Sequence, residues 1–241
     1  MQLSIFSYRF AQEILQHPNY STAWHEIETI VKDAPLFIYP QKSQKNKQLD
    51  VVQQLLNTYF DRVFVLGARW DNHPLATGIK DSALRADFRK AFGNLKIQTE
   101  VQFGNMARWY TDVFKFQTAY SQSLINIGLS IVPTLELAKR IDSNIVNFER
   151  AKRELPSADL SITLPILMIG VAHDNKTAEV DVSRCQFASI REITGKGKLE
   201  NRKRIVNGYL NRVPMDLIGP TSDIGPAFEV FEEDEDLEIA P

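Results

Sequence analysis

Cysteine is nearly absent from this sequence, since Cys185 is the only one among 241 residues. A single cysteine excludes an intrachain disulfide and a zinc site built from several cysteines. No uninterrupted apolar run approaches the roughly 18 residues that a membrane-spanning helix needs. Residues 1–7 lack the basic start and the apolar stretch of a secretory signal. We therefore expect a cytoplasmic protein.

The sequence also lacks an excess of either charge, because 28 basic and 30 acidic residues give a net charge of −2. A balance of this kind, taken alone, argues against a nucleic-acid-binding protein. Hydrophobic residues make up 44% and charged residues 24% of the chain. These values are typical of folded globular chains and exclude collagenous, rod-like and disordered classes. The length predicts one domain over residues 1–225.

The balanced total hides two segments of opposite charge. Residues 229–238 contain seven acidic and no basic side chains, so we interpret residues 226–241 as an acidic, flexible tail. Residues 194–212 contain six basic side chains and one acid, a local charge of +5. This segment is either a charged surface loop or a strip that embraces DNA phosphates. The side chains proposed for DNA contact are Lys196, Lys198, Arg202, Lys203 and Arg204.

Hydrophobic periodicity predicts alternating helices and strands. Helices are expected at about residues 8–16, from an N-cap at Ser21 to Pro35, and at 49–63, 106–120 and 134–154. A strand is expected at residues 96–103, and buried apolar runs are expected at 124–132 and 162–172. This order predicts an α/β fold in which a central mixed β-sheet is flanked by helices.

The strand at residues 96–103 carries the candidate chemistry. Its polar side chains Gln98, Glu100 and Gln102 alternate with less polar ones and so share one face. An acidic residue on such a face, before an amphipathic helix, is typical of nucleases that hold magnesium against a phosphate. Asp87 is the nearest candidate for a second carboxylate. The alternative is a half-exposed edge strand with a solvated glutamate.

Residues 100–105, with the sequence EVQFGN, resemble the active-site strand and following turn of type II restriction endonucleases of the BglII, BstYI and BamHI group. Their superfamily has the motif PD…(D/E)xK, and Gln102 stands where lysine is usual, as in the BglII-like members. Further similarity extends from about residue 10 to 175 through four short segments, at residues 11–15, 24–28, 143–149 and 164–170.

The resemblance implies a restriction-endonuclease-like PD-(D/E)xK core and a homodimer that cleaves both strands of a short DNA palindrome. It further implies magnesium as cofactor, a GATC core in the recognised site, and a cognate DNA methyltransferase as genetic partner. In this group, helices beside the site form the twofold interface, so the aromatic helix at 106–120 is a candidate for dimer contacts. The outer bases and the cut position are not specified by the sequence.

The resemblance also assigns catalytic roles. Asp87 and Glu100 are the expected magnesium ligands, together with the backbone carbonyl of Val101, because this ion prefers hard oxygen donors. Gln102 has an amide that does not titrate, so it is expected to orient the attacking water instead of acting as a base.

DNA-reading roles follow in the same way. Asn105 is expected to contact a base edge in the core of the site, and Ser143 and Asn144 are expected to contact outer bases. The alternative for Ser143 and Asn144 is capping of a helix start.

Two departures from the family pattern leave alternatives open. The interval between Asp87 and Glu100 is longer than in the relatives, so Asp81 is an alternative first carboxylate; Asp87 is favoured because Phe88 follows it. A further polar group from upstream could be Asn72 or His73. Two other functions also stay open, a monomeric repair or nicking nuclease of the same superfamily and a DNA-binding protein that has lost catalysis.

Overall fold

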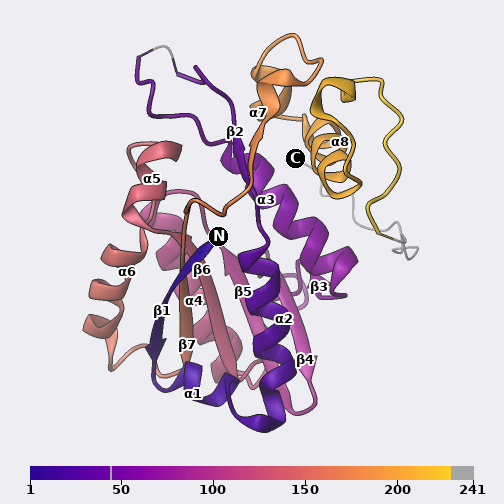
Figure 1. The fold of residues 1–241 in the computed structure, drawn as a ribbon. Helices are drawn as coiled ribbons and strands as arrows, with labels where there is room; N and C mark the ends of the chain where they lie inside the picture. Colours follow the sequence, from indigo (N-terminus) through magenta and orange to yellow (C-terminus); the bar gives the residue numbers. More distant parts are fainter. Residues whose placement is uncertain (44, 229–241) are drawn as a thin grey trace.

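The computed structural model describes residues 1–43 and 45–228 (Figure 1). A six-stranded sheet with the order β1-β7-β6-β5-β4-β3 forms its centre. The strands are β1 (Gln2–Tyr8), β3 (Asp71–Asn72), β4 (Phe88–Phe92), β5 (Leu95–Val101), β6 (Ile127–Pro133) and β7 (Ile166–Ala172). Strands β5, β6 and β7 are parallel, and the other pairs are antiparallel, so the predicted mixed sheet is confirmed. Strands β2 (Leu36–Ile38) and β8 (Glu179–Asp181) form a separate parallel pair.

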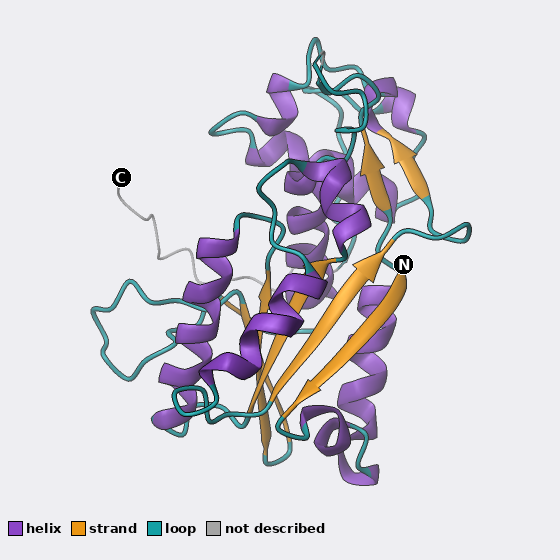
Figure 2. Cartoon of the chain, turned by 90° about the vertical axis from the view of Figure 1, so that its left-hand side faces the viewer, coloured by secondary structure: helices purple, strands orange, loops and turns teal. Residues whose placement is uncertain are grey.

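Helices cover both faces of the sheet, as Figure 2 shows. Their bounds are α1 (Ala11–Leu15), α2 (Ser21–Lys32), α3 (Gln53–Asp61), α4 (Met106–Ser121), α5 (Leu135–Ile141), α6 (Phe148–Glu154), α7 (Arg191–Thr194) and α8 (Leu199–Leu210). Short 3-10 turns occupy Pro18–Tyr20, Leu155–Ala158, Val182–Arg184 and Met215–Leu217, and a π-helical turn at Arg62–Gly67 extends α3. No helix in the described part of the chain is long and apolar enough to span a membrane.

The period of two along the strands sorts the core into two layers. On β5 and β6, Ile97, Val101 and Leu129 belong to the larger apolar cluster, which includes α2 and α3. The opposite face is covered by α4, whose Trp109 and Phe116 belong to the second cluster. The polar face of β5 is therefore buried beneath a helix, and the interpretation of an exposed edge strand is wrong.

Several expected boundaries are wrong. Residues 2–8 form strand β1 instead of leading into a helix at residue 8, and α3 begins at Gln53, later than expected. Ser21 is the first residue of α2 and not its N-cap, a position that Tyr20 occupies. The helix expected over residues 134–154 is two helices, α5 and α6, separated by residues 142–147. The acidic, flexible tail is predicted at residues 226–241, and its residues 229–241 lie outside the described part of the chain.

Candidate active site

The carboxyl end of β5 brings the two predicted carboxylates together. Strand β4 pairs antiparallel with β5, with Phe88 opposite Thr99, and this register places Asp87 at the level of Glu100. The backbone N–H of Val101 donates to Asp87 Oδ2 at 2.8 Å. Asp81, the alternative first carboxylate, is exposed in the loop before β4. The backbone therefore fixes Asp87 beside the strand that carries Glu100.

Glu100 is almost fully enclosed, with 1% of its side chain exposed. Its Oε1 accepts a hydrogen bond from Gln98 Nε2 at 3.2 Å, and its Oε2 lies 2.9 Å from Lys115 Nζ. Lys115 extends from α4 and also contacts Asp112 Oδ1 at 3.0 Å. A lysine and a second carboxylate from the covering helix thus complete the surroundings of Glu100.

Both the oxygen and the nitrogen of the Gln102 amide form hydrogen bonds within the protein. Its Oε1 accepts a hydrogen bond from the N–H of Gly104 at 2.8 Å, and its Nε2 donates to Asp112 Oδ2 at 2.8 Å. A Cβ at position 104 would lie 2.6 Å from Gln102 Oε1, so glycine permits this close approach. The amide orientation is therefore fixed, and its second N–H remains to donate.

Burial and like charge act together on the acids of the site. Burial, followed by the charges of Asp87 and Asp112, raises the pKa of Glu100 well above its usual range, against the opposing effect of Lys115. Burial also raises the pKa of Asp87 and of Asp112. Burial alone would lower the pKa of Lys115, but the charges of Glu100 and Asp112 outweigh it and raise that pKa. The pocket is therefore acidic, and an added positive charge would stabilise its ionised carboxylates.

The donor set at this site fits a hard divalent cation. In residues 1–43 and 45–228 no group of three histidine, cysteine or acidic side chains is arranged to hold a metal ion. Magnesium in phosphate-handling sites is, however, commonly held by one or two carboxylates, with water and substrate phosphate completing its shell. The register of β4 and β5 sets Asp87 at the level of Glu100, and the charge of Asp87 raises the pKa of Glu100 after the larger effect of burial. Two carboxylates in a buried site repel each other, and a bound cation relieves this repulsion.

A cleft of about 320 Å³ lies on the side of Asp87 and is lined by segments far apart in the sequence. Its lining includes Asp61 of α3, Asn72 and His73 of the β3 region, and Lys203 of α8. The N–H of His73 donates to the backbone carbonyl of Asp87 at 3.0 Å. Both upstream candidates, Asn72 and His73, therefore lie next to the predicted first carboxylate.

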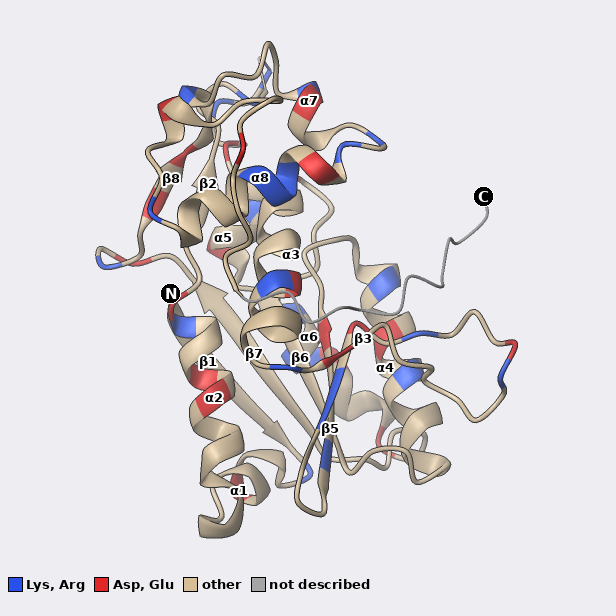
Figure 3. Cartoon of the chain, turned by 90° about the vertical axis from the view of Figure 1, so that its right-hand side faces the viewer, with Lys and Arg blue, Asp and Glu red and all other residues tan. Residues whose placement is uncertain are grey.

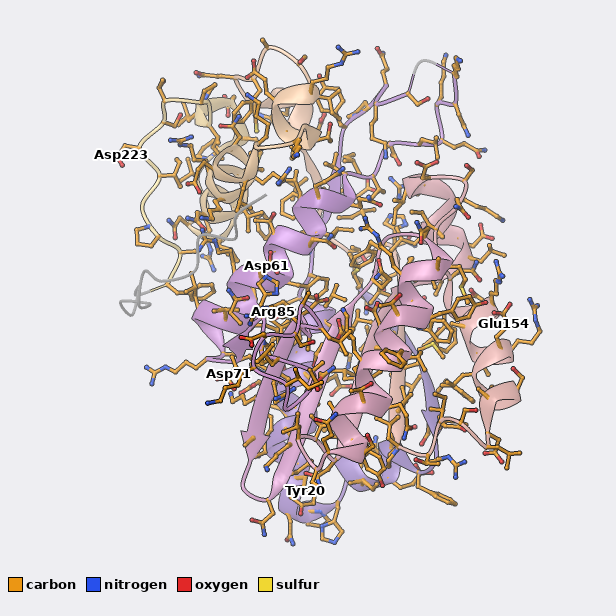
Figure 4. All side chains as sticks on the ribbon, turned by 180° about the vertical axis from the view of Figure 1, so that it is seen from behind. Tyr20, Asp61, Asp71, Arg85, Glu154 and Asp223 are labelled. Carbon is orange, nitrogen blue, oxygen red and sulfur yellow. The ribbon has the colours of Figure 1, made fainter. Side chains whose placement is uncertain are left out.

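Asp61 adds a half-buried acid to this cleft, and Figure 4 shows it on α3. Burial, followed by the charge of Asp87, raises its pKa from 3.8 to about 6. A raised pKa means that the folded state retains the proton between pH 4 and 6 while the unfolded state loses it. The stability therefore falls as the pH rises through this window, and the full penalty is present above pH 6.

We expect Asp61→Asn to increase the free energy of unfolding by about 1 to 3 kcal/mol at pH 7. Urea unfolding in the presence of EDTA measures this difference. The advantage should be small at pH 4, grow up to about pH 7 and then level off. Asp223→Asn, a change at a site in the C-terminal part of the described chain, serves as control. An advantage of Asp61→Asn that does not vary with pH contradicts the assignment of the shift to Asp61.

The loop after β5 lies beside the segment that separates α5 from α6. The N–H of Val146 donates to the carbonyl of Gly104 at 2.9 Å, and Asn105 forms an isolated bridge with Ile145. Asn105 Oδ1 accepts from the N–H of Arg108 at 3.0 Å and so caps α4. The cap occupies the amide oxygen of Asn105 and leaves its NH₂ group as a donor.

The two other predicted base contacts lie on this neighbouring segment. Ser143 and Asn144 are exposed, and the N–H of Ser143 donates to Asp142 Oδ1 at 2.6 Å. The cap of α6 is Asn147, whose Oδ1 accepts from the N–H of Arg150 at 3.0 Å. Capping of α6 therefore does not explain Ser143 and Asn144.

The basic segment at residues 194–212 is mostly helix, since α8 occupies residues 199–210 and packs on α3. Figure 3 colours the lysine and arginine positions of the chain blue on the ribbon, those of α8 included. Lys196 and Lys198 are exposed before the helix. The Arg202 side chain instead extends to residues that precede the helix, where its Nη1 donates to the carbonyls of Ile193 and Gly195 at 3.1 and 3.4 Å.

The next two basic side chains of α8 have neighbours on their own helix. Lys203 forms an ion pair of 2.8 Å with Glu200, and Arg204 Nη1 lies 3.4 Å from Asn201 Oδ1. Contacts of this kind on a helix surface are weak and leave the charge available to a ligand. Lys203 also lines the cleft on the side of Asp87, together with Asp61, Asn72 and His73.

Sequence reasoning missed three polar side chains of this region: Asp61, Asp112 and Lys115. Asp112 adjoins the apolar stripe formed by Trp109, Val113 and Phe116 on α4. An acidic residue next to the buried stripe of a helix was the available signal, because burial of an unpaired carboxylate is costly. Lys115, three residues further, is its partner.

Comparisons with known proteins give a match to a family and similarity of fold to solved structures. A family model described as "Restriction endonuclease BglII/BglIII" matches residues 3–171. The crystal structure of restriction endonuclease BglII complexed with a DNA 16-mer is similar to this structure with a TM-score of 0.61, at 20% identity over 73% of this chain and 81% of that chain. The crystal structure of free BglII gives a TM-score of 0.50, at 19% identity over 73% and 82% of the two chains. A search of curated proteins finds no match.

Proposed function

Since the chain belongs to the BglII/BglIII restriction endonuclease family, a family of site-specific deoxyribonucleases, we propose that it cleaves both strands of a short DNA palindrome with a GATC core in a magnesium-dependent reaction. The observation that carries this proposal is the pair of carboxylates Asp87 and Glu100, aligned by the register of β4 and β5. The related structure that holds a DNA 16-mer supports double-stranded DNA as the substrate.

Asp87, Glu100 and the Val101 carbonyl would hold the metal ion. The ion supplies an activated water and neutralises charge that develops on the phosphate. Gln102 contributes orientation: its oxygen is held by the Gly104 N–H, so its remaining amide N–H can donate to the attacking water or to a phosphate oxygen. Asn72 and His73 line the adjoining cleft, on the side of Asp87.

Asn105, Ser143 and Asn144 would read bases. Their two segments lie side by side in the structure, through the contact between Gly104 and Val146. Because Asn105 uses its amide oxygen to cap α4, its NH₂ group is the part that can contact a base acceptor such as a purine N7. The exposed Ser143 and Asn144 extend the same surface toward the outer bases.

A palindromic site calls for a twofold symmetric enzyme in which each subunit cuts one strand. Helix α4 offers a face for such a homodimer, because Tyr110 and Phe114 are 46% and 60% exposed on it. Tyr110 also donates a hydrogen bond to Glu154 of α6, which joins the two helices at this surface. Large exposed aromatic side chains on neighbouring turns of a helix are typical of subunit interfaces.

A plasmid digest with magnesium, followed by sequencing of the fragment ends, tests the function. We expect cleavage at one short palindrome containing GATC, and protection of the same DNA by the cognate methyltransferase. Single-strand nicks from a monomeric protein would instead indicate a repair or nicking nuclease, and magnesium-independent binding without any cut would indicate a DNA-binding protein. The proposed place of action is the cytoplasm, where such an enzyme meets DNA.

DNA binding is expected to weaken steeply with salt, because basic side chains release counterions from the duplex. Changing both Lys203 and Arg204 to glutamine should reduce the slope of log K against log [salt] by about 2 to 4, since the change removes two charges from each subunit of the dimer and each phosphate contact contributes nearly one unit. Fluorescence anisotropy across a salt series measures the slope. Glutamine at both Lys32 and Lys176, which lie beside the N-terminal strand, is the control. An equal slope in both variants would show that α8 does not contact phosphates.

A further inference from the structure

The active-site strand has an amide at position 102, yet a lysine is present in the site. Lys115 Nζ lies 2.9 Å from Glu100 Oε2 and 3.0 Å from Asp112 Oδ1. Only 16% of the Lys115 side chain is exposed, and its two partners are exposed by 1% and 6%. Lysine is strongly hydrated and seldom buried without a specific partner, so this enclosure places its charge at the site.

Gln102 and Lys115 converge on the same carboxylate from two elements. Asp112 binds Gln102 Nε2 through Oδ2 and Lys115 Nζ through Oδ1. Gln102 is two residues beyond Glu100 on the same strand face, a separation of about 7 Å along the strand. A lysine at position 102 would therefore direct its amino group toward the same pair of carboxylates that Lys115 now contacts.

We propose that Lys115 supplies, from helix α4, the positive charge that the strand lacks at position 102, and that it acts as a positioning residue for Glu100 and for the approach of the DNA phosphate. Without it, Asp87, Glu100 and Asp112 form an uncompensated acidic pocket, in which each charge repels the others and a phosphate. With it, Glu100 is held in place before a metal ion and DNA arrive. This inference rests on the proposed nuclease function.

The charge of Lys115 predicts a defect in DNA binding that depends on the metal. We expect Lys115→Met to bind the duplex that contains the sequence cut in the digest about tenfold more weakly than wild type in EDTA, because one charge near a phosphate in a partly buried site has an effect of this order. In Ca²⁺ the affinity should return to within about threefold of wild type, since a divalent cation replaces the missing charge.

Three further variants separate charge compensation from a merely structural role. Lys115→Arg retains the charge and should bind nearly as wild type in EDTA. The double variant Gln102→Lys with Lys115→Met returns the charge to the strand and should recover most of the binding in EDTA. Lys90→Met is the control, because Lys90 forms a partly buried ion pair with Glu26 on the other face of the sheet. The Lys90→Met variant should have a lower melting temperature, and its DNA affinity relative to wild type should be the same in EDTA and in Ca²⁺.

The outcomes are distinct. Equal binding by Lys115→Met and wild type in EDTA overturns the inference, as does an equal loss in EDTA and in Ca²⁺. If the double variant binds DNA in EDTA no more tightly than Lys115→Met, the inference that Lys115 replaces a charge at position 102 is overturned. If the wild-type protein neither cuts nor binds DNA, the proposed function itself is contradicted. If the wild-type protein cuts and binds DNA, and Lys115→Met binds as tightly as wild type, only the inference about Lys115 is contradicted.

Discussion

Glu100→Ala is expected to lower the rate of DNA cleavage by at least about 10³-fold, because it removes an acidic ligand from the site that stabilises charge on the reacting phosphate. Glu100 is central to that site: Gln98, Lys115 and the charge of Asp87 all act on it. Specific DNA binding should survive, since loss of a negative charge from an acidic pocket reduces its repulsion of a phosphate. Single-turnover cleavage and a gel-shift assay in Ca²⁺ measure the two effects.

Glu26→Ala is the matched control for this variant. Glu26 is also paired with a lysine, Lys90, and it accepts a hydrogen bond from the Trp70 indole, but it is only partly buried and belongs to α2 on the opposite face of the sheet. Its loss should reduce thermal stability and change the cleavage rate by less than about threefold. Cleavage at a single sequence by Glu100→Ala at a near wild-type rate would falsify the assignment of this strand as the active site.

Asp87→Ala is expected to lower cleavage by a similar factor, at least about 10³-fold, whereas Asp81→Ala should change it by less than threefold. The physical reason is position. Asp87 accepts the Val101 N–H at the end of β5, and Asp81 is an exposed residue of the preceding loop. Parallel measurement of the two variants under single-turnover conditions decides which acid is the first carboxylate.

Binding of a divalent cation provides a readout that does not depend on the chemical step. Titration of Mn²⁺ into the protein–DNA complex should show weaker binding for Asp87→Ala and unchanged binding for Asp81→Ala. Asp87→Asn keeps an oxygen that can accept the Val101 N–H while losing the charge, so it distinguishes loss of the ligand from loss of the backbone contact. The opposite ranking, with Asp81→Ala inactive, contradicts the proposed pair.

The central elements of the fold were predictable because strong local patterns define them. The buried runs that became β6 and β7 and the amphipathic helix α4 have periodicities that few other structures satisfy. Strand β1 was missed because residues 2–8 alternate weakly and are followed directly by the short helix α1. Its stability comes from pairing with β7, a distant contact that local sequence does not encode.

The division between α5 and α6 also had a weak signal. Neither proline nor glycine occurs in residues 142–147, so the sequence predicts one continuous helix through this segment. The actual break depends on Asn147, which caps α6, and on the Gly104–Val146 contact with the loop after β5. A tertiary contact therefore decides a local boundary, and it also presents Ser143 and Asn144 to solvent.

Residues of the candidate site could be proposed from the sequence where they share one strand, and not where the packing of a helix brings them together. Glu100 and Gln102 follow from the alternation along β5, and Asp87 follows from its neighbour Phe88. Asp112 and Lys115 could be placed only by knowing which face of α4 covers the polar side of β5. Side chains that meet through the docking of a helix on a sheet have no fixed spacing in sequence.

The pairing of β1 with β7 has a consequence for synthesis of the protein on the ribosome. Gln2 lies opposite Ala172, so β1 must wait for 170 further residues to be made before its whole partner strand exists. At a translation rate of about 5 to 20 residues per second, the wait is on the order of 10 to 30 s. Meanwhile β4, β5 and α4 have already been made. A nascent chain thus holds an unpaired strand with exposed backbone groups for this interval, and chaperone dependence of folding should map to β1.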